Sequence, residues 1–459
     1  MNIWKGRFHA EPRLQILRFT QSLDLDWRLF EYDIEGSVAH VRMLCSVGLL
    51  TEEERDKLVE ALREIKAEIA RGELPPSIAL EDLHLNVEHR LIEKLGPLGA
   101  KVHTGRSRND QICVDVRMYL RDQLKELRVK TRRLLNTLLE LAERDVDVII
   151  PGYTHLQQGQ PISAGHYWMA YFWKFLRDLK RLDLAIYNTD ENPLGSGALA
   201  GSTLPLDREF TRRELGFSRN TENSLDAVSN RDFMLDFHYF ASTFMVHCSR
   251  LAEDLVIYAS GEFGYVELPD EYCTGSSMMP QKKNPDVLEL IRGKAGQVFG
   301  HLLDLMVTLK GLPLAYNRDM QEDKRGLWAA LATVHSVLDI LPGMLSATRF
   351  NQERILQSMR DGFILATDVA EYLVMKGVPF REAHGVVGRA VRDCFDSSRT
   401  LFDLTLEDWR RYHPAFDEDV FEVLDLQRAV DRRRTYGGTA RSEVRRQLER
   451  GREILRELD

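Results

Sequence analysis

Residues 112–144, ICVDVRMYLRDQLKELRVKTRRLLNTLLELAER, decide the fold class that this sequence predicts. Apolar residues recur there at intervals of three, four or seven: Val116, Leu120, Leu124, Leu127, Leu134, Leu138 and Leu141. This spacing puts them on one face of an α-helix, with charged residues on the other face. At about 1.5 Å per residue the helix is roughly 50 Å long, so we expect it to pack against other long helices or other subunits.

Two more stretches show the same helical pattern. Residues 233–259 are rich in Phe, Leu, Met and Val, and residues 287–309 repeat apolar side chains at helical spacing. Strand-like alternation is scarce, and no repeat of fixed period is visible. The sequence therefore predicts an all-α protein built on a bundle of long helices. Its last hundred residues form shorter helical pieces, with an arginine-rich tail at 432–452 that we expect to be a solvated face.

The composition is that of an ordinary protein with several cores. A length of 459 residues predicts two to four domains, and a net charge of -9 argues against attraction to nucleic acid. The five cysteines, Cys45, Cys113, Cys248, Cys273 and Cys394, include no Cys-x-x-Cys pair, which favours free thiols in a reducing compartment. Without a leader-like apolar segment or an uninterrupted apolar run of about 18 residues, we expect a cytoplasmic protein without membrane contact.

Residues 275–285, GSSMMPQKKNP, are the stretch that most clearly indicates chemistry. Gly and paired Ser favour a mobile backbone, and the Asn284-Pro285 pair breaks the chain before the next helical pattern. A serine acts as base or nucleophile only if its pKa is lowered or a partner takes its proton, and two lysines follow in this loop. From the loop alone, a Gly/Ser surface linker with a solvated lysine pair remains an equal alternative.

The loop resembles the signature of the fumarase/aspartase superfamily, and its wording resembles the argininosuccinate lyase family. Three further segments carry the same resemblance in the same order: residues 103–111 (HTGRSRNDQ), 152–157 (GYTHLQ) and 316–324 (YNRDMQEDK). The match begins near residues 4–8 (WKGRF) and covers essentially the whole chain. Four agreeing segments make a chance match improbable, whereas one segment alone is weak evidence.

The resemblance implies an all-α fold of three mostly helical domains: residues 1–105, a central long-helix bundle at 106–357 with the catalytic loop, and a small domain at 358–459. It implies a homotetramer whose active sites combine several subunits. The implied reaction is the reversible β-elimination of argininosuccinate to L-arginine and fumarate, in arginine biosynthesis, without metal or organic cofactor. The expected partners are this small-molecule substrate and further copies of the chain, with no nucleic acid and no membrane.

The resemblance also implies roles for particular residues. Ser276 is the base that removes the carbon proton, Lys282 holds developing negative charge, and His155 is an acid/base or orienting group coupled to Glu289. The expected substrate-binding residues are Ser22, Asp82, Ser107, Arg108, Asn109, Thr154, Asn284, Tyr316, Gln321 and Lys324. The expected supporting residues are Asp26, His84, Arg231 and Asp323. The chain departs from the family wording at Gln158-Gly159, where Arg-Ala is common, at Met278 and at Gly293.

Several alternatives stay open at this point. Another lyase of the superfamily, acting on adenylosuccinate, aspartate or fumarate, shares the loop pattern, and some relatives are non-enzymatic structural proteins. Asp82 and His84 have a spacing seen in metal sites, but no third ligand follows at a sensible distance. Glu289 also suits a plain helix N-terminus. The proton donor to the leaving group is not readable from sequence.

Overall fold

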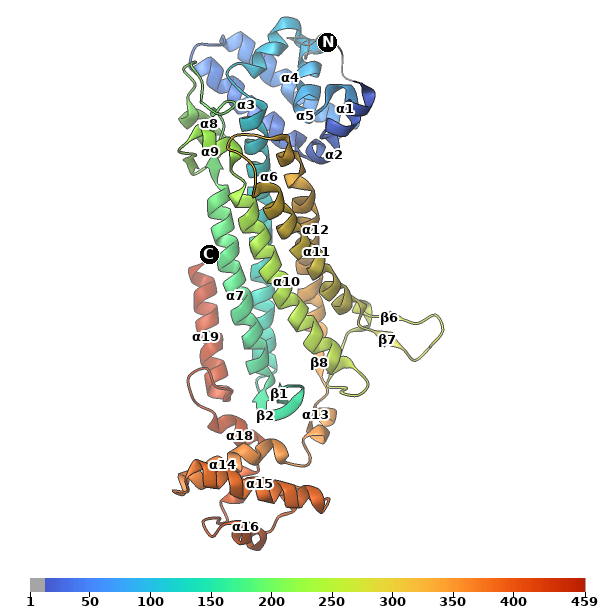
Figure 1. Cartoon of the computed structure of the whole chain (residues 1–459), viewed down its shortest axis with the longest axis vertical. Helices are drawn as coiled ribbons and strands as arrows, with labels where there is room; N and C mark the ends of the chain where they lie inside the picture. The colour runs from blue at the N-terminus through green and yellow to red at the C-terminus, as the bar shows by residue number, and fades with distance from the viewer. Residues whose placement is uncertain (1–12, 459) are drawn as a thin grey trace. The chain divides into compact units, whose positions relative to one another are not determined.

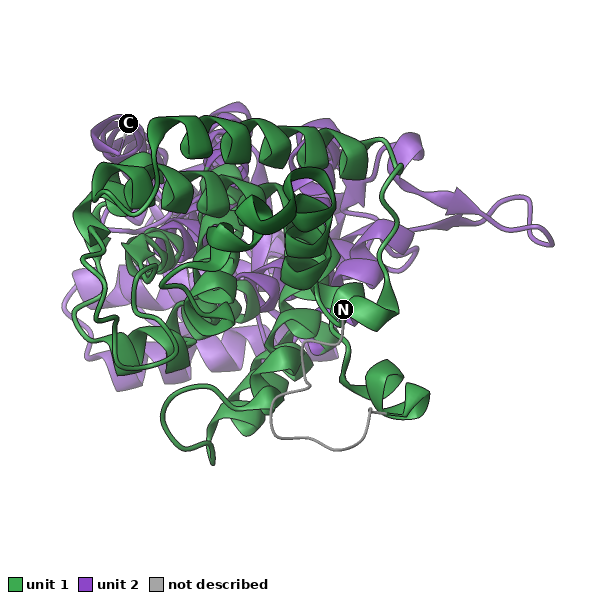
Figure 2. Cartoon of the chain, turned by 90° about the horizontal axis from the view of Figure 1, so that it is seen from above, with its two compact units in different colours: residues 1–128, 181–242, 297–333 green, residues 129–180, 243–296, 334–459 purple. Residues whose placement is uncertain are grey.

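The computed structural model describes residues 13–458 and is mostly helical, as the periodicity predicts (Figure 1). The chain divides into two compact units, each assembled from three segments (Figure 2). Unit 1 contains residues 1–128, 181–242 and 297–333, and unit 2 contains residues 129–180, 243–296 and 334–459. Residues 4–8, which contribute to the family resemblance, lie outside the described residues. The division into three domains stays a prediction.

Unit 1 holds the N-terminal helices and one part of each long helix. Its elements, with 3-10 helices written η, are α1 (Leu14–Thr20), α2 (Leu23–Asp26), η1 (Trp27–Leu29), α3 (Phe30–Ser46), α4 (Glu52–Ala70), η2 (Ile78–Leu80), α5 (Leu83–Leu95), η3 (Gly96–His103), β3 (Glu191–Asn192), α8 (Arg208–Glu214), β4 (Arg219–Asn220), α9 (Ser224–Ser229) and η5 (Arg318–Glu322). Strands β3 and β4 pair in parallel. The long helices α6 (Arg108–Arg144), α7 (Ala164–Thr189), α10 (Asp232–Ala259), α11 (Asp286–Leu309) and α12 (Asp323–Ala347) have residues in both units.

Unit 2 holds the remaining parts of those helices and the C-terminal elements. These are β1 (Ile149–Thr154), β2 (Gln157–Ser163), β5 (Val266–Glu267), η4 (Asp270–Tyr272), β6 (Thr274–Gly275), β7 (Lys283–Asn284), β8 (Arg349–Phe350), α13 (Gln352–Ser358), η6 (Phe363–Leu365), α14 (Ala366–Met375), α15 (Phe380–Asp396), η7 (Leu401–Asp403), α16 (Leu406–Tyr412), α17 (Val420–Val423), α18 (Leu426–Arg432) and α19 (Arg441–Glu457). Strands β1–β2, β5–β8 and β6–β7 form three antiparallel pairs.

The long helices agree closely with the predicted ones. All seven apolar positions of the predicted stripe on α6 are buried, and α10 and α11 cover the other two predicted stretches to within one residue. The sequence analysis did not identify α7 and α12, although each has at least 25 residues. It also did not identify the β1–β2 hairpin. Part of the arginine-rich tail is helix α19, which buries Val444, Leu448 and Leu455 and so is more than a solvated face.

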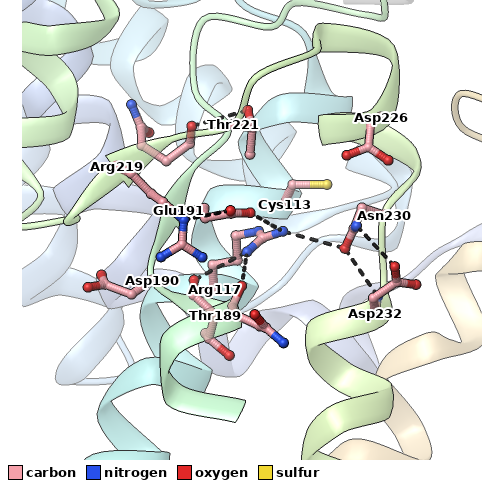
Figure 3. Close-up of polar contacts among 12 residues, drawn as sticks. Cys113, Arg117, Thr189, Asp190, Glu191, Arg219, Thr221, Asp226, Asn230 and Asp232 are labelled. Atoms are coloured by element: carbon pink, nitrogen blue, oxygen red, sulfur yellow. Dashed lines mark hydrogen bonds and ion pairs between the residues drawn. The ribbon is translucent and has the colours of Figure 1, made fainter. Parts of the chain in front are cut away.

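A buried arginine ties α6 to the end of α7 inside unit 1 (Figure 3). Arg117 is 1% exposed, and its Nη1 donates to the backbone oxygens of Asn188 (2.9 Å) and Thr189 (3.3 Å). The carbonyls at a helix end have no partner within the helix, so a cation there is stabilising. Its guanidinium also lies over the ring of Phe233 at 4.2 Å. Because burial disfavours the charged form, it lowers the pKa of Arg117 to about 10.

Within the described residues, one helical stretch, Arg318–Ala347, is long and apolar enough to cross a membrane by length and composition, with a mean hydropathy of 1.4. Half of that apolar window is buried inside the protein, and Leu327, Leu331 and Val334 are almost fully covered. Such burial is typical of a helix in the core of a globular protein, because a membrane-spanning helix presents its apolar side chains to lipid.

Candidate active site

Unit 1 contains a cavity of about 210 Å³ that collects residues from five separate segments of the chain. It is lined by Ser22, Asp26, Glu81, Asp82, His84, Arg108, Asn109, Ile112, Arg231, Tyr316, Arg318, Gln321 and Lys324. Ten of these thirteen were selected from the sequence. Ser107 and Asp323 were also selected, but they do not line the cavity. The cavity therefore brings together most of the predicted substrate-binding residues.

Arg108, the first residue of α6, is held by a carboxylate that also caps α5. One carboxylate oxygen of Asp82 accepts a hydrogen bond from the backbone N–H of Leu85 (2.8 Å), which caps α5. The other oxygen lies 3.1 Å from Nε of Arg108. Burial raises the pKa of Asp82, while the charges of His84 and Arg108 act in the opposite direction. Ser107 directly precedes α6, and its Oγ accepts from the backbone N–H of Asn109 (3.2 Å), so it serves as a helix cap.

A buried ion-pair chain forms a second wall. Asp323 receives Nε of Arg231 at 2.5 Å and Nζ of Lys324 at 2.8 Å, and all three side chains are nearly fully buried. Lys324 also lies 3.7 Å from Asp26, whose other oxygen accepts from Ser22. Although burial favours the neutral acid, the two cations lower the pKa of Asp323 below its ordinary value. Asp323, which does not line the cavity, thus fixes the positions of two cations that do.

His84 belongs to a buried cluster that the sequence analysis did not detect. Its Nδ1 lies 2.8 Å from Asp33 and 3.8 Å from Asp115, and Gln111 donates to the same Asp33 oxygen at 2.5 Å. Burial lowers the pKa of His84, but the charge of Asp33 together with those of Asp82 and Asp115 raises it to about 9. Asp33, His84 and Asp115 could in principle hold a metal, since their ligand atoms lie within 4.8 Å of one another. The hydrogen bond to Asp33 and the retained proton make the His84 ring fit an ion pair instead.

In unit 2, Thr154 and His155 lie at the tip of the β1–β2 hairpin. Thr154 pairs with Gln157, which leaves His155 and Leu156 as the two turn residues. Both have positive φ, 56° and 55°, and both side chains are exposed. Two-residue hairpin turns of this kind favour Asn and Gly, because a Cβ in the left-handed region costs about 1–2 kcal/mol per residue. Backbone strain therefore coincides with the predicted catalytic histidine.

Ser276 lies at the start of the loop between β6 and β7, which projects away from the helices of unit 2 (Figure 1). Its Oγ accepts hydrogen bonds from the backbone N–H groups of Met278 (3.2 Å) and Met279 (3.0 Å). Two N–H donors aimed at one oxygen favour negative charge on it. Lys283 anchors the base of the loop through Glu267 (2.6 Å) and Asp270 (2.7 Å).

Other predicted residues of unit 2 remain apart. Lys282 is exposed and Asn284 half-buried on this loop. Glu289 lies in the first turn of α11, as predicted, and its nearest cation is Arg292 at 3.9 Å. Among residues 13–458, no hydrogen bond or ion pair joins His155 to Glu289 or to Ser276. The coupling of His155 to Glu289 therefore stays a prediction.

Sequence reasoning missed three residues that line the unit 1 cavity: Glu81, Ile112 and Arg318. Glu81 and Arg318 form an ion pair with each other. Arg318 lies inside the quoted 316–324 segment and Glu81 directly precedes Asp82, so proximity in sequence was the available signal. The positive φ of Glu81, 63°, was not readable from sequence, because it depends on the turn that the surrounding residues impose.

The chain carries a serine held by two N–H groups on an exposed loop of unit 2 and a mixed-charge cavity in unit 1, and its family matches place this helical protein among the lyases. A family model described as Lyase matches residues 6–300, and one described as Argininosuccinate lyase C-terminal matches residues 363–431. The chain belongs to the argininosuccinate lyase family.

Curated relatives match along their whole length. The argininosuccinate lyase of Moorella thermoacetica is 49% identical over 455 residues, covering 99% of this chain and 98% of the relative. That of Hahella chejuensis is 49% identical over 454 residues, covering 99% and 97%. Among solved structures, EDDS lyase in complex with formate has a TM-score of 0.86 at 28% identity, covering 94% of this chain and 87% of that one. Class II fumarase from Schistosoma mansoni, at 16% identity and a TM-score of 0.74, covers 92% of each chain and shares the fold.

Proposed function

We propose that this protein is a carbon–nitrogen lyase that cleaves argininosuccinate reversibly to L-arginine and fumarate, a step of arginine biosynthesis. The observation that carries the chemistry is the pair of backbone N–H groups on Oγ of Ser276, 3.0 and 3.2 Å away. A serine removes a proton from carbon only when its oxygen carries negative charge, and these two donors stabilise that charge.

The elimination has two parts, which are removal of a proton from carbon and breakage of the carbon–nitrogen bond. Ser276 takes the proton from the carbon next to a carboxylate, and the carbon–nitrogen bond breaks with its electron pair going to the guanidino nitrogen, which must gain a proton. Lys282 and Asn284 hold the charge that develops on the substrate carboxylate. His155 is the acid/base or orienting group, and Glu289 is its partner. The exposed loop closes over the substrate, because exclusion of water strengthens these interactions.

The unit 1 cavity supplies the binding groups. Its lining includes the carboxylates of Asp26, Glu81 and Asp82, and cations that include Arg108 and Lys324. A wall with both signs of charge suits a ligand that carries carboxylate, ammonium and guanidinium groups together. The substrate-binding residues we assign are Ser22, Asp82, Ser107, Arg108, Asn109, Thr154, Asn284, Tyr316, Gln321 and Lys324, with Asp26, His84, Arg231 and Asp323 in support.

We assign the active form as a homotetramer with sites composed from several subunits. Helix α11 leaves Leu303 (62%), Met306 (49%) and Val307 (50%) exposed on its surface. A Cβ added to Gly293, Gly296 or Gly300 of the same helix would meet nothing within 4 Å. Apolar side chains beside glycines allow close packing of helices from another copy of the chain. Sedimentation of the active protein as a monomer would contradict this assignment.

We also retain the three-domain division, at residues 1–105, 106–357 and 358–459, and a cytoplasmic location. The isolated segment 358–459 tests the first of these, because a domain with its own core folds alone. A cooperative thermal transition of that fragment would support the boundary at 357/358, and a fragment without one would overturn it.

The reaction is tested by following fumarate through its ultraviolet absorbance. The purified protein is incubated with argininosuccinate, with adenylosuccinate and malate in parallel. Fumarate formed from argininosuccinate alone would support the proposal. Fumarate from one of the other two compounds would assign a sibling reaction, and no product from a folded tetramer would indicate a structural role.

A further inference from the structure

The hairpin turn that presents His155 is exposed and strained, so contacts outside the turn must hold it in place. Residues 154–160 are all exposed, and neither turn residue is the Gly or Asn that the left-handed backbone favours. A hairpin of this kind depends on the cross-strand pairs behind the turn. The first pair behind it is Thr154 with Gln157, and the next is Tyr153 with Gln158.

The side chains of that second pair both reach one oxygen outside the hairpin. The hydroxyls of Tyr153 and Tyr265 are 2.9 Å apart. Gln158 lies within 3.5 Å of the same Tyr265 hydroxyl through its Nε2, at the long end of hydrogen bonding, and donates to the backbone oxygen of Ser358 at 3.1 Å. Both strands of the hairpin are thus tied to the rest of unit 2 one residue beyond the pair that flanks the turn.

Tyr265 is itself rigidly placed. It is 5% exposed, its backbone N–H donates to Tyr258 (2.7 Å), and its carbonyl accepts from Asn351 (2.8 Å). Its ring centroid lies 5.3 Å from that of Phe263 and 5.8 Å from that of Tyr258. Backbone bonds on both sides and aromatic packing leave the hydroxyl little freedom, so it is a fixed reference point for the hairpin.

We propose that Tyr265 is a positioning residue for His155, its hydroxyl fixing the base of the hairpin turn that carries the histidine into the site. Tyr153 and Gln158 transmit this constraint. Gln158 carries an uncharged amide, which suits an anchor made of a hydroxyl and a carbonyl. The inference rests on the proposed function, because it is in that reaction that His155 acts.

The test compares Tyr265→Phe with Tyr258→Phe in the full-length protein. Both remove one hydroxyl from the same aromatic cluster, but among the described residues the Tyr258 hydroxyl makes no hydrogen bond. For Tyr265→Phe we expect kcat to fall about 10- to 100-fold, since small displacements of a reacting group are costly, with KM changed by less than about twofold. Tyr258→Phe leaves both constants near wild type.

Hydrogen exchange provides a readout that needs no turnover. The amides of residues 154–158 exchange about fivefold faster or more in Tyr265→Phe, as loss of one hydrogen bond predicts, and remain unchanged in Tyr258→Phe. If Tyr265→Phe does not fold, Tyr153→Phe takes its place. It removes the other hydroxyl of the same bond and is expected to give the same result. In the double variant Tyr153→Phe/Tyr265→Phe the loss of kcat equals that of either single variant.

The outcomes separate the two hypotheses. A wild-type protein without lyase activity would refute the proposed function, and hydrogen exchange alone would then decide whether Tyr265 anchors the hairpin. An active wild type with unchanged kcat in Tyr265→Phe would refute the positioning role. So would equal exchange rates in the Tyr265→Phe and Tyr258→Phe variants, or equal losses of kcat in both.

Discussion

Arg231 and Asp323 form an ion pair with Nε and Oδ2 2.5 Å apart, and their side chains are only 3% and 1% exposed. The two residues are far apart in sequence, on the α9–α10 connection and at the start of α12. Asp323 also receives Lys324, so one carboxylate contacts two buried cations. Breaking such a pair by removing one partner leaves an uncompensated charge in the interior.

Asp323→Asn is therefore expected to lower the free energy of unfolding by about 3–5 kcal/mol. The matched control is Asp417→Asn, because Asp417 pairs with Arg410 at 2.9 Å where both side chains are more than half exposed. The control is expected to cost less than about 1 kcal/mol. Urea unfolding at pH 7 measures both. Equal effects would contradict the role assigned to the buried pair.

Ser276→Ala is expected to lower kcat by about 10²–10⁴-fold or more, the usual contribution of a positioned base, while the protein still binds argininosuccinate. Ser277→Ala is the matched control, since Ser277 is the exposed neighbour in the same loop. It should retain activity within about threefold. Steady-state kinetics measure turnover, and calorimetry measures substrate binding. Near-normal turnover by the Ser276 variant would exclude this residue as the base.

The buried His84 makes the folding stability of the protein depend on pH in the alkaline range. Its pKa is raised from 6.5 to about 9 in the folded protein, so its contribution is full below pH 6.5 and is lost as pH rises through 9. A shift of this size corresponds to about 3 kcal/mol. His84→Gln should thus destabilise the protein at pH 7 by most of this amount and much less at pH 9.5.

The control for that prediction is His166→Gln. Burial lowers the pKa of His166, so its ring is neutral at both pH 7 and pH 9.5. The difference in unfolding free energy between His166→Gln and wild type should therefore be the same at pH 7 and pH 9.5. Urea titrations at the two pH values measure it. A pH-independent cost for His84→Gln would show that the ring is neutral in the folded state.

The strained turn at His155 and Leu156 predicts opposite effects of two substitutions. Leu156 is 62% exposed with φ of 55°, so its replacement changes backbone preference more than packing. Leu156→Asn should stabilise the hairpin because Asn tolerates the left-handed region, whereas Leu156→Val should destabilise it. We expect the two variants to differ by about 1–2 kcal/mol in hydrogen-exchange protection of residues 154–158. The reverse order would contradict the strain.

Much of the site was predictable because its residues lie in short segments with distinctive wording. Arg108 and Asn109 open a helix, Ser276 and Lys282 lie in one loop, and all four were selected from sequence. Asp33 and Asp115 were not, since each is one carboxylate on a long helix and only the packing of α3, α5 and α6 brings them to His84. Tyr265 was not selected for the same reason, because the residue that it contacts, Tyr153, is 112 residues away in sequence.

The sequence by itself determined the helical class, the stripe of α6 and the reactive loop, because helical periodicity and turn chemistry are local properties of the chain. Only the tertiary structure decided which carboxylate faces which cation, that His155 occupies a strained turn, and that Tyr265 anchors it. These depend on contacts between distant segments and on the dielectric of the buried interior, and no local pattern encodes either.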